Sequence, residues 1–122
     1  MKKIIPYGSQ YIDKSDIKDV STALSKDIIT SGATTLKFEK KISEYLNCRY
    51  AVTSNSGTSA IFIALHALNL KKGDKIIMPA INFIASYNAA KLLGAKIYLA
   101  DVDQYTGQMR PEDVEDCCKK FG

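Results

Sequence analysis

The first third of the chain places hydrophobic residues at the spacing of α-helices. Such residues recur every three or four positions over residues 12–26, which predicts a helix whose start Asp13 or Ser15 can cap. A second amphipathic helix is predicted over residues 36–46. The residues between them, 27–35, are mostly small or β-branched, so we expect an ordered loop there.

From residue 50 onwards, short hydrophobic runs alternate with helical patterns. The predicted elements are, in order, a strand at 50–53, a helix at 58–68, a strand at 75–79, a helix at 83–93 capped by Gly94, a strand at 96–100, and a helix at 112–119 preceded by Pro111. This alternation is typical of parallel β-α-β units with helices on both faces of the sheet. The helix at 58–68 is hydrophobic on most sides, so we expect it to be buried. We predict one incomplete α/β domain.

Composition and charge narrow the classes of protein. The 122 residues are 46% hydrophobic, and no hydrophobic run approaches the ~20 residues of a membrane span. Pro6 and Gly8 follow the first lysines in place of a hydrophobic stretch, so we expect no signal peptide and a cytoplasmic location. The net charge of +4 comes from lysines scattered among acidic residues, whereas nucleic-acid-binding proteins cluster lysine and arginine residues on one face. We therefore expect neither a nucleic acid nor a membrane as partner.

Cysteine and histidine usage argues against structural cross-links and metals. The three cysteines are Cys48, Cys117 and Cys118, an odd number that does not suggest a disulfide framework. The chain has no Cys-x-x-Cys motif and one histidine, so we expect no metal site. That histidine, His66, lies in a predicted helix, and we interpret it as a packing or surface residue.

Candidate chemistry lies in the loops that leave the predicted strands, since open parallel sheets bind ligands beyond the carboxyl ends of their strands. Residues 54–59 form a hydroxyl-rich turn at the start of a helix, where free N–H groups and the helix dipole favour an anion. Gly57 allows close approach of an anion, and the hydroxyls of Ser56, Thr58 and Ser59 add donors. The alternative is that Ser54, Asn55 or Ser56 only caps the helix.

Two further loops offer weaker signals. Phe83 follows the strand at 75–79, where its ring can stack on a planar heterocycle or can simply pack in the core. Asp101 and Asp103 leave the strand at 96–100, and two acidic residues supply too few ligands for a metal, so a turn or a helix cap is the better interpretation.

Several short motifs follow one another along almost the whole chain. They are Thr30-Ser31-Gly32, Phe38-Glu39, Tyr50-Ala51-Val52, Asn55-Ser56-Gly57-Thr58-Ser59-Ala60, Gly73-Asp74-Lys75-Ile76-Ile77-Met78-Pro79, Asn82-Phe83-Ile84-Ala85-Ser86, Gly94-Ala95-Lys96 and Asp101-Val102-Asp103. In order and spacing they resemble the DegT/DnrJ/StrS-type nucleotide-sugar aminotransferases. The resemblance implies that residues 1–122 are the amino-terminal part of the large domain of a fold-type I transferase that uses pyridoxal 5′-phosphate (PLP), with a parallel or mixed sheet flanked by helices.

The resemblance also implies roles for individual positions. Gly57, Thr58 and Ser59 match the family's phosphate-binding turn, and Phe83 matches the aromatic residue that stacks on the pyridine ring. The positions that match segments bordering the sugar-nucleotide pocket are Tyr7, Asp27, Ile28, Ile29 and Thr30. The opening segment from Tyr7 to Ile17 and the segment from Asp27 to Thr30 look closest to members of the pseudaminic-acid pathway, which aminate a UDP-linked 4-keto-6-deoxy hexosamine with glutamate as amino donor. Family members are homodimers, and the activity implied is the synthesis of amino sugars for surface polysaccharides or glycans.

The family's catalytic lysine is expected beyond the position where this chain stops, together with the acidic partner of the pyridinium nitrogen. We therefore assign no catalytic residue within the chain and expect the chain alone to be inactive. Two alternatives stay open within this resemblance: a truncated, non-catalytic remnant, and a PLP-dependent sugar dehydratase in which histidine replaces the lysine. A generic nucleotide-binding module is disfavoured, because no glycine-rich dinucleotide motif is present.

Overall fold

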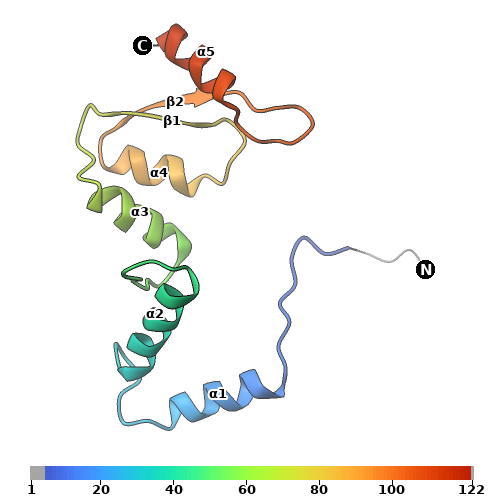
Figure 1. The fold of residues 1–122 in the computed structure, drawn as a ribbon, viewed down its shortest axis with the longest axis vertical. Coiled ribbons are helices and arrows are strands. Elements are labelled where there is room, and N and C mark those ends of the chain that lie inside the picture. The colour runs from blue at the N-terminus through green and yellow to red at the C-terminus, as the bar shows by residue number, and fades with distance from the viewer. Residues whose placement is uncertain (1–4, 122) are drawn as a thin grey trace. The chain divides into compact units, whose positions relative to one another are not determined.

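A computed structural model describes residues 5–121 of the chain (Figure 1). Its elements are α1 (Lys14–Leu24), α2 (Ala33–Tyr45), α3 (Gly57–Ala67), β1 (Lys75–Pro79), α4 (Ala85–Leu92), β2 (Lys96–Ala100) and α5 (Pro111–Phe121). Contacts divide the chain into two compact units, one ending at Thr53 and one beginning at Ser54. The expected absence of a signal peptide rests partly on residues 1–4, which lie outside the described residues.

Helix α1 begins with a reciprocal pair of side-chain caps. The Asp13 carboxylate accepts the N–H groups of Ser15 at 2.7 Å and Asp16 at 3.1 Å, and the Asp16 carboxylate accepts the Asp13 N–H at 2.9 Å. The Ser15 hydroxyl and these two amides lower the pKa of Asp13. Of the two predicted caps, Asp13 is therefore the one that acts, and the predicted helix is confirmed.

Helix α2 begins at Ala33, so the loop predicted over 27–35 ends earlier than expected. The Gly32 carbonyl accepts the N–H groups of Thr35 at 3.0 Å and Leu36 at 3.4 Å, which starts the helix before its first large hydrophobic residue. The low helix propensity of Thr34 and Thr35 is a small cost, and the hydrogen bonds of the first turn outweigh it.

The segment 50–53 is not a strand, which corrects the prediction of a third strand. A strand needs a neighbour for its N–H and C=O groups, and among the described residues this segment has none. The Thr53 N–H and hydroxyl donate instead to the Glu39 carboxylate on α2, both at 2.8 Å. These two bonds lower the pKa of Glu39, the backbone bond contributing most.

The second unit contains one β-α-β unit. Strands β1 and β2 pair in parallel, with Lys75 opposite Lys96 and Pro79 opposite Ala100, and both match their predicted bounds. Helix α4 connects them, as a parallel pair requires. Helices α4 and α5 both contact β2, and they lie on opposite sides of the strands (Figure 1).

The buried hydrophobic core belongs to this second unit. Its members come from β1, β2, α4 and α5, and are Met78, Ala85, Ala89, Ala90, Ala100 and Cys117. Most are alanines, whose small side chains let α4 approach the sheet closely. Helix α3 packs against α4, yet none of its residues is buried. The expected burial of this helix is therefore wrong for the described residues, because only one side of it meets another element.

Gly94 ends α4 in the left-handed conformation, as predicted for a C-terminal cap. Its φ is +82°, and a Cβ placed there would lie 3.1 Å from the Cα of Lys72. The Gly94 carbonyl also accepts the Gly73 N–H at 3.0 Å, which ties the end of α4 to the turn that precedes β1. Both the backbone angle and the close approach therefore require glycine.

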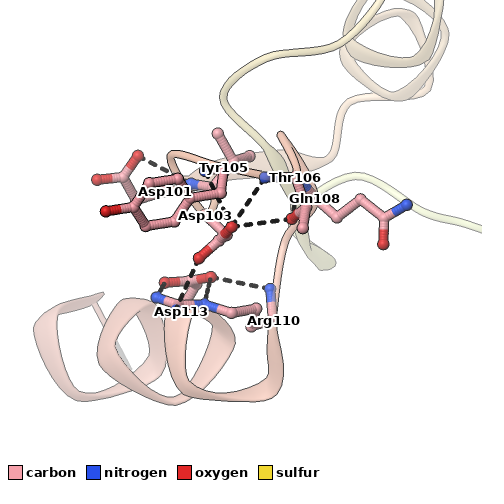
Figure 2. Close-up of polar contacts among 8 residues, drawn as sticks. Asp101, Asp103, Tyr105, Thr106, Gln108, Arg110 and Asp113 are labelled. Atoms are coloured by element: carbon pink, nitrogen blue, oxygen red, sulfur yellow. Dashed lines mark hydrogen bonds and ion pairs between the residues drawn. The ribbon is translucent and has the colours of Figure 1, made fainter.

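The loop between β2 and α5 is closed by a cluster of polar contacts (Figure 2). The Asp103 carboxylate accepts the N–H groups of Thr106 at 2.9 Å and Tyr105 at 3.0 Å, and these two bonds contribute most to lowering its pKa. Arg110 lies 3.2 Å from Asp103 and 3.1 Å from Asp113, and the Asp113 carboxylate also accepts the Arg110 N–H at 2.8 Å. The predicted turn or cap role of Asp103 agrees with these contacts.

Substitution of Gly94 by alanine tests the requirement for glycine. We expect Gly94→Ala to lower the free energy of unfolding by about 1 kcal/mol or more, because it forces a Cβ into a left-handed backbone and against Lys72. Urea titration measures the change. The control is Gly8→Ala, where a Cβ has no atom within 4 Å and φ is not left-handed; it should change stability by less than about 0.5 kcal/mol. Equal effects of the two variants would contradict the role of Gly94.

Substitution of Arg110 by methionine tests the ion-pair cluster. The pKa of Asp113 is lowered chiefly by the Arg110 side chain, whereas the charge of Arg110 is the smallest of the causes that lower the pKa of Asp103. We therefore expect Arg110→Met to raise the pKa of Asp113 more than that of Asp103, measured by NMR titration of the carboxyl groups.

The sign of the stability change follows from these lowered pKa values. A carboxylate with a lowered folded-state pKa stabilises the fold above its unfolded pKa, about 3.9, and loses this contribution as the pH falls through its folded pKa. Arg110→Met should therefore reduce the loss of stability on acidification. Arg49→Met is the matched control, since Arg49 makes no ion pair with the described residues. A larger shift at Asp103 than at Asp113 would refute the assignment.

Candidate functional site

The start of α3 is a capped helical turn. Ser56 is the N-cap residue, with extended backbone angles, and its hydroxyl oxygen accepts the Ser59 N–H at 3.2 Å. The Ser56 carbonyl accepts the Ala60 N–H at 3.0 Å, which closes the first helical turn. The hydroxyl-rich sequence thus forms a capped helix start, as the alternative interpretation of the turn predicted.

The cap leaves two neighbouring donors free. Within residues 5–121, the N–H groups of Gly57 and Thr58 donate no hydrogen bond. Both lie at the positive end of the α3 dipole, and the first turn of α3 holds no acidic residue. A Cβ placed on Gly57 would have no atom within 4 Å, so the space beside this amide is open. These features suit a small dianion such as a phosphate group.

A hydrophobic groove of about 370 Å³ runs from this turn along α3 and α4. Thr58 and Ser59 form its polar end, and its other lining residues are Phe62, Ile63, Asn88, Ala89 and Leu92. Phe62 and Ile63 follow Thr58 and Ser59 by one helical turn, so the spacing of the sequence indicated this shared face. The facing residues of α4 could not be paired with it from the sequence, because their contact depends on how the two helices pack.

Phe83 is exposed, with 72% of its surface accessible, so the structure does not support the alternative of core packing. It lies two residues before α4, and its N–H donates to the Asn82 side-chain oxygen at 2.7 Å. Phe83 is not among the described residues that line the groove beside Thr58 and Ser59. The structure therefore leaves its ring free for a ligand and does not show the ring beside the α3 turn.

The expected sugar-nucleotide residues belong to the first unit. Ile28 and Ile29 line a hollow of about 170 Å³ together with residues of α1 and α2, including Leu24 and Thr35. Tyr7, Asp27 and Thr30 are exposed and do not line that hollow. Of the five residues expected to border the sugar-nucleotide pocket, the structure therefore places Ile28 and Ile29 in this hollow and the other three outside it.

The third loop is occupied by its own hydrogen bonds. The Asp101 carboxylate accepts the Val102 N–H at 2.8 Å, and Asp103 belongs to the cluster with Arg110. Among the described residues, no group of three histidine, cysteine, aspartate or glutamate side chains can hold a metal ion. No helix within residues 5–121 is long and hydrophobic enough to cross a membrane.

Two curated relatives are similar to most of this chain. GDP-perosamine synthase of Escherichia coli O157:H7 is 37% identical over 114 residues, which is 93% of this chain and 31% of that protein. UDP-4-amino-4,6-dideoxy-N-acetyl-β-L-altrosamine transaminase of Campylobacter jejuni (strain 81-176) is 38% identical over 100 residues, which is 81% of this chain and 26% of that protein. The chain therefore spans about a quarter to a third of the length of these relatives.

A solved structure shows the same fold. Escherichia coli GDP-4-keto-6-deoxy-D-mannose-3-dehydratase with bound hydrated PLP matches with a TM-score of 0.85 and 26% identity. The match covers 91% of this chain and 30% of the dehydratase. The predicted fold class is thereby confirmed: the chain is a partial α/β domain of the kind found in PLP-dependent enzymes of this fold.

A family model accounts for nearly all of the described chain. It matches residues 10–121, which reach into both compact units and include every helix and strand. The chain belongs to the DegT/DnrJ/EryC1/StrS aminotransferase family.

Proposed function

We propose that this chain forms the part of a nucleotide-sugar aminotransferase that binds the phosphate of PLP. The observation that supports it best is the start of α3, where the Gly57 and Thr58 amides are free at the positive end of a helix. Family membership suggests which anion this is, since a structure of the same fold holds PLP. A helix start alone accepts many anions, so the proposal depends on both observations together.

The residues of the turn fit a phosphate group. The amides of Gly57 and Thr58 would each donate to a phosphate oxygen, and the hydroxyls of Thr58 and Ser59 would add two more donors. Hydrogen bonds to an ionised acceptor are about twice as strong as neutral ones, so these donors anchor the cofactor by its charge. Once bound, PLP supplies an electron sink for chemistry at the carbon that bears the amino group.

Phe83 is proposed to lie against the pyridine ring. Its side chain is exposed two residues before α4, so its hydrophobic ring is in contact with water when no ligand is bound. Stacking on a planar heterocycle would recover that surface and fix the plane of the ring. Phosphate binding and ring orientation would thus come from two different loops of the second unit.

The substrate and the assembly extend beyond this chain. We propose a nucleotide-linked keto-deoxysugar as the amino acceptor, since the names of the two relatives contain a GDP-linked and a UDP-linked sugar. Glutamate is the proposed amino donor. Within the chain, the proposed contacts to the sugar nucleotide are Tyr7, Asp27, Ile28, Ile29 and Thr30. We assign the catalytic lysine to none of the lysines of this chain. A homodimer in the cytoplasm that serves polysaccharide synthesis completes the proposal.

A dehydratase is the second candidate. The PLP-dependent dehydratase from Escherichia coli has a TM-score of 0.85 with this chain, so the same fold also supports removal of a hydroxyl group. Both candidates need the same phosphate-binding turn. A choice between them rests on the residue that holds the cofactor's aldehyde, which we assign to no position here.

Gly57→Val tests the phosphate-binding turn. The added side chain enters the open space beside the Gly57 amide, so we expect at least about a tenfold loss of affinity for pyridoxine 5′-phosphate. This analogue has no aldehyde and cannot react with surface lysines, so equilibrium dialysis reports the docked cofactor alone. Pyridoxine without the phosphate is the control, and its weaker binding should not change. Equal losses for both ligands would contradict a phosphate-specific role.

Phe83→Ala tests the ring contact separately. Loss of a stacked aromatic pair costs about 0.5–1.5 kcal/mol beyond the lost area, so we expect the affinity for pyridoxine 5′-phosphate to fall several-fold. The affinity for inorganic phosphate should stay the same, since that ion has no ring. If Phe83→Ala weakened inorganic phosphate equally, Phe83 would act through the turn or the fold and the stacking role would be wrong.

A further inference from the structure

A lysine side chain spans the loop that joins α1 and α2. The Lys26 ammonium group donates a hydrogen bond to the Thr34 hydroxyl oxygen at 2.8 Å, although the two residues are eight positions apart in the sequence. The loop between them contains residues 27–30, which are proposed to contact the sugar nucleotide. The contact therefore closes this loop at its base.

The loop also folds back on its own backbone. Ser31 has a left-handed φ of +46°, and a Cβ placed on Gly32 would lie 3.2 Å from the carbonyl oxygen of Ile28. A side chain at position 32 would therefore push Ile28 away. This close approach allows Ile28 and Thr34 to line the same hollow of about 170 Å³.

The hollow is hydrophobic apart from two hydroxyl groups. Its aliphatic side chains come from Ala23, Leu24, Ile28 and Ile29, and its hydroxyls from Thr34 and Thr35. A diphosphate would lose hydration against the aliphatic side chains, which is costly for a charged group. A sugar ring, in contrast, can place its C–H groups against them and its oxygens towards the hydroxyls. The lining of the hollow therefore suits a sugar better than a phosphate.

The chemistry of lysine determines the direction of the bond between Lys26 and Thr34. An ammonium group can only donate, so the Thr34 oxygen accepts and the hydrogen of that hydroxyl is left for another acceptor. Within residues 5–121 the Thr34 hydroxyl donates no hydrogen bond. The side chain of Thr34 thus lines the hollow as a hydrogen-bond donor.

We propose that Thr34 donates a hydrogen bond to an oxygen of the sugar in a nucleotide-linked sugar, and that Lys26 is the positioning residue that holds the hydroxyl ready to donate. The proposal rests on the sugar-nucleotide role proposed for residues 27–30. Neither Thr34 nor Lys26 is among the residues that the sequence motifs assigned to this role. The cofactor turn belongs to the other compact unit, so the two sites can be tested separately.

Thr34→Val removes the hydroxyl and keeps the shape of the side chain. Binding of UDP-N-acetylglucosamine and of UDP is measured by isothermal titration calorimetry, so that the difference between the two ligands reports the sugar. We expect about three- to tenfold weaker binding of UDP-N-acetylglucosamine, the effect of one lost hydrogen bond, and unchanged binding of UDP. Thr34→Ser keeps a hydroxyl and should retain the affinity. Equal losses for the two ligands would overturn the assignment to the sugar.

A double-mutant cycle tests the positioning role of Lys26. Lys26→Met should weaken binding of UDP-N-acetylglucosamine by about twofold or more, whereas Lys26→Arg, which can still donate, should not. Because Lys26 is proposed to act only through Thr34, the double variant Lys26→Met/Thr34→Val should bind no more weakly than Thr34→Val alone. Additive losses in the double variant would overturn the role of Lys26.

Two matched variants control for the loss of a hydroxyl and of a charge. Thr22→Val removes a hydroxyl that donates to the Lys18 carbonyl, and Lys40→Met removes an exposed charge on α2. Neither residue lines the hollow, so both variants should keep the affinities of the unchanged protein. All variants should also bind pyridoxine 5′-phosphate equally, since the cofactor turn lies in the other unit.

The unchanged protein separates failure of this proposal from failure of the proposed function. If it does not bind UDP-N-acetylglucosamine more tightly than UDP, the sugar-nucleotide role of residues 27–30 fails, and the role of Thr34 fails with it. If it does, and Thr34→Val binds normally, only the role of Thr34 fails. Should Thr34→Val lower the thermal midpoint, the Thr34→Ser variant and the Lys26 variants decide the question.

Discussion

Unsatisfied backbone amides at the start of a helix need an acceptor, and α3 places two of them side by side. The usual device, a side chain that reaches back from the N-cap, occupies only the third amide here, because the Ser56 hydroxyl binds the Ser59 N–H. The Gly57 and Thr58 amides therefore depend on water or on a ligand. Gly57 leaves the space beside them open, and no acidic residue of the first turn competes for them. The proposed function depends on this deficit of acceptors together with the family to which the chain belongs.

The rest of the second unit supports this helix start. Strands β1 and β2 form the base, and the buried alanines of α4 hold that helix against them. Helix α4 in turn packs against α3, so the groove beside Thr58 and Ser59 depends on the β-α-β unit. The Gly94 cap fixes where α4 ends, and the Asp103–Arg110–Asp113 cluster fixes where α5 begins. None of these features needs contact with a ligand, so they can be tested by stability measurements alone.

Local signals in the sequence predicted the elements whose own residues determine them. Both strands were predicted with their bounds, because local signals mark their ends. The hydrophobic run of β1 ends at Pro79, and that of β2 begins shortly after the helix-ending Gly94. The α1 cap at Asp13 and the Pro111 start of α5 also depend on neighbouring residues only. The strand predicted at 50–53 was wrong because a strand requires a partner, which no local pattern supplies. The burial of α3 was wrong for a similar reason, since a hydrophobic surface does not say what covers it.

The candidate site was predicted in part. Sequence reasoning located the turn at Ser56 to Ser59 and the aromatic residue Phe83, and the family is confirmed by the comparison over residues 10–121. The contacts of the Ser56 hydroxyl within the turn were beyond it, because they depend on how the backbone of the turn folds. The ligand-binding roles of Gly57, Thr58, Ser59 and Phe83 remain predictions.

NMR titration of backbone amides tests the central claim most directly. Hydrogen bonding of an amide to an anion moves its proton resonance downfield, and each residue is observed separately. On addition of pyridoxine 5′-phosphate, we expect the largest downfield shifts at the amides of Gly57 and Thr58, with a smaller change at Ser59, whose amide is bound to Ser56. Saturable binding that leaves the Gly57 and Thr58 amides unshifted would contradict the account.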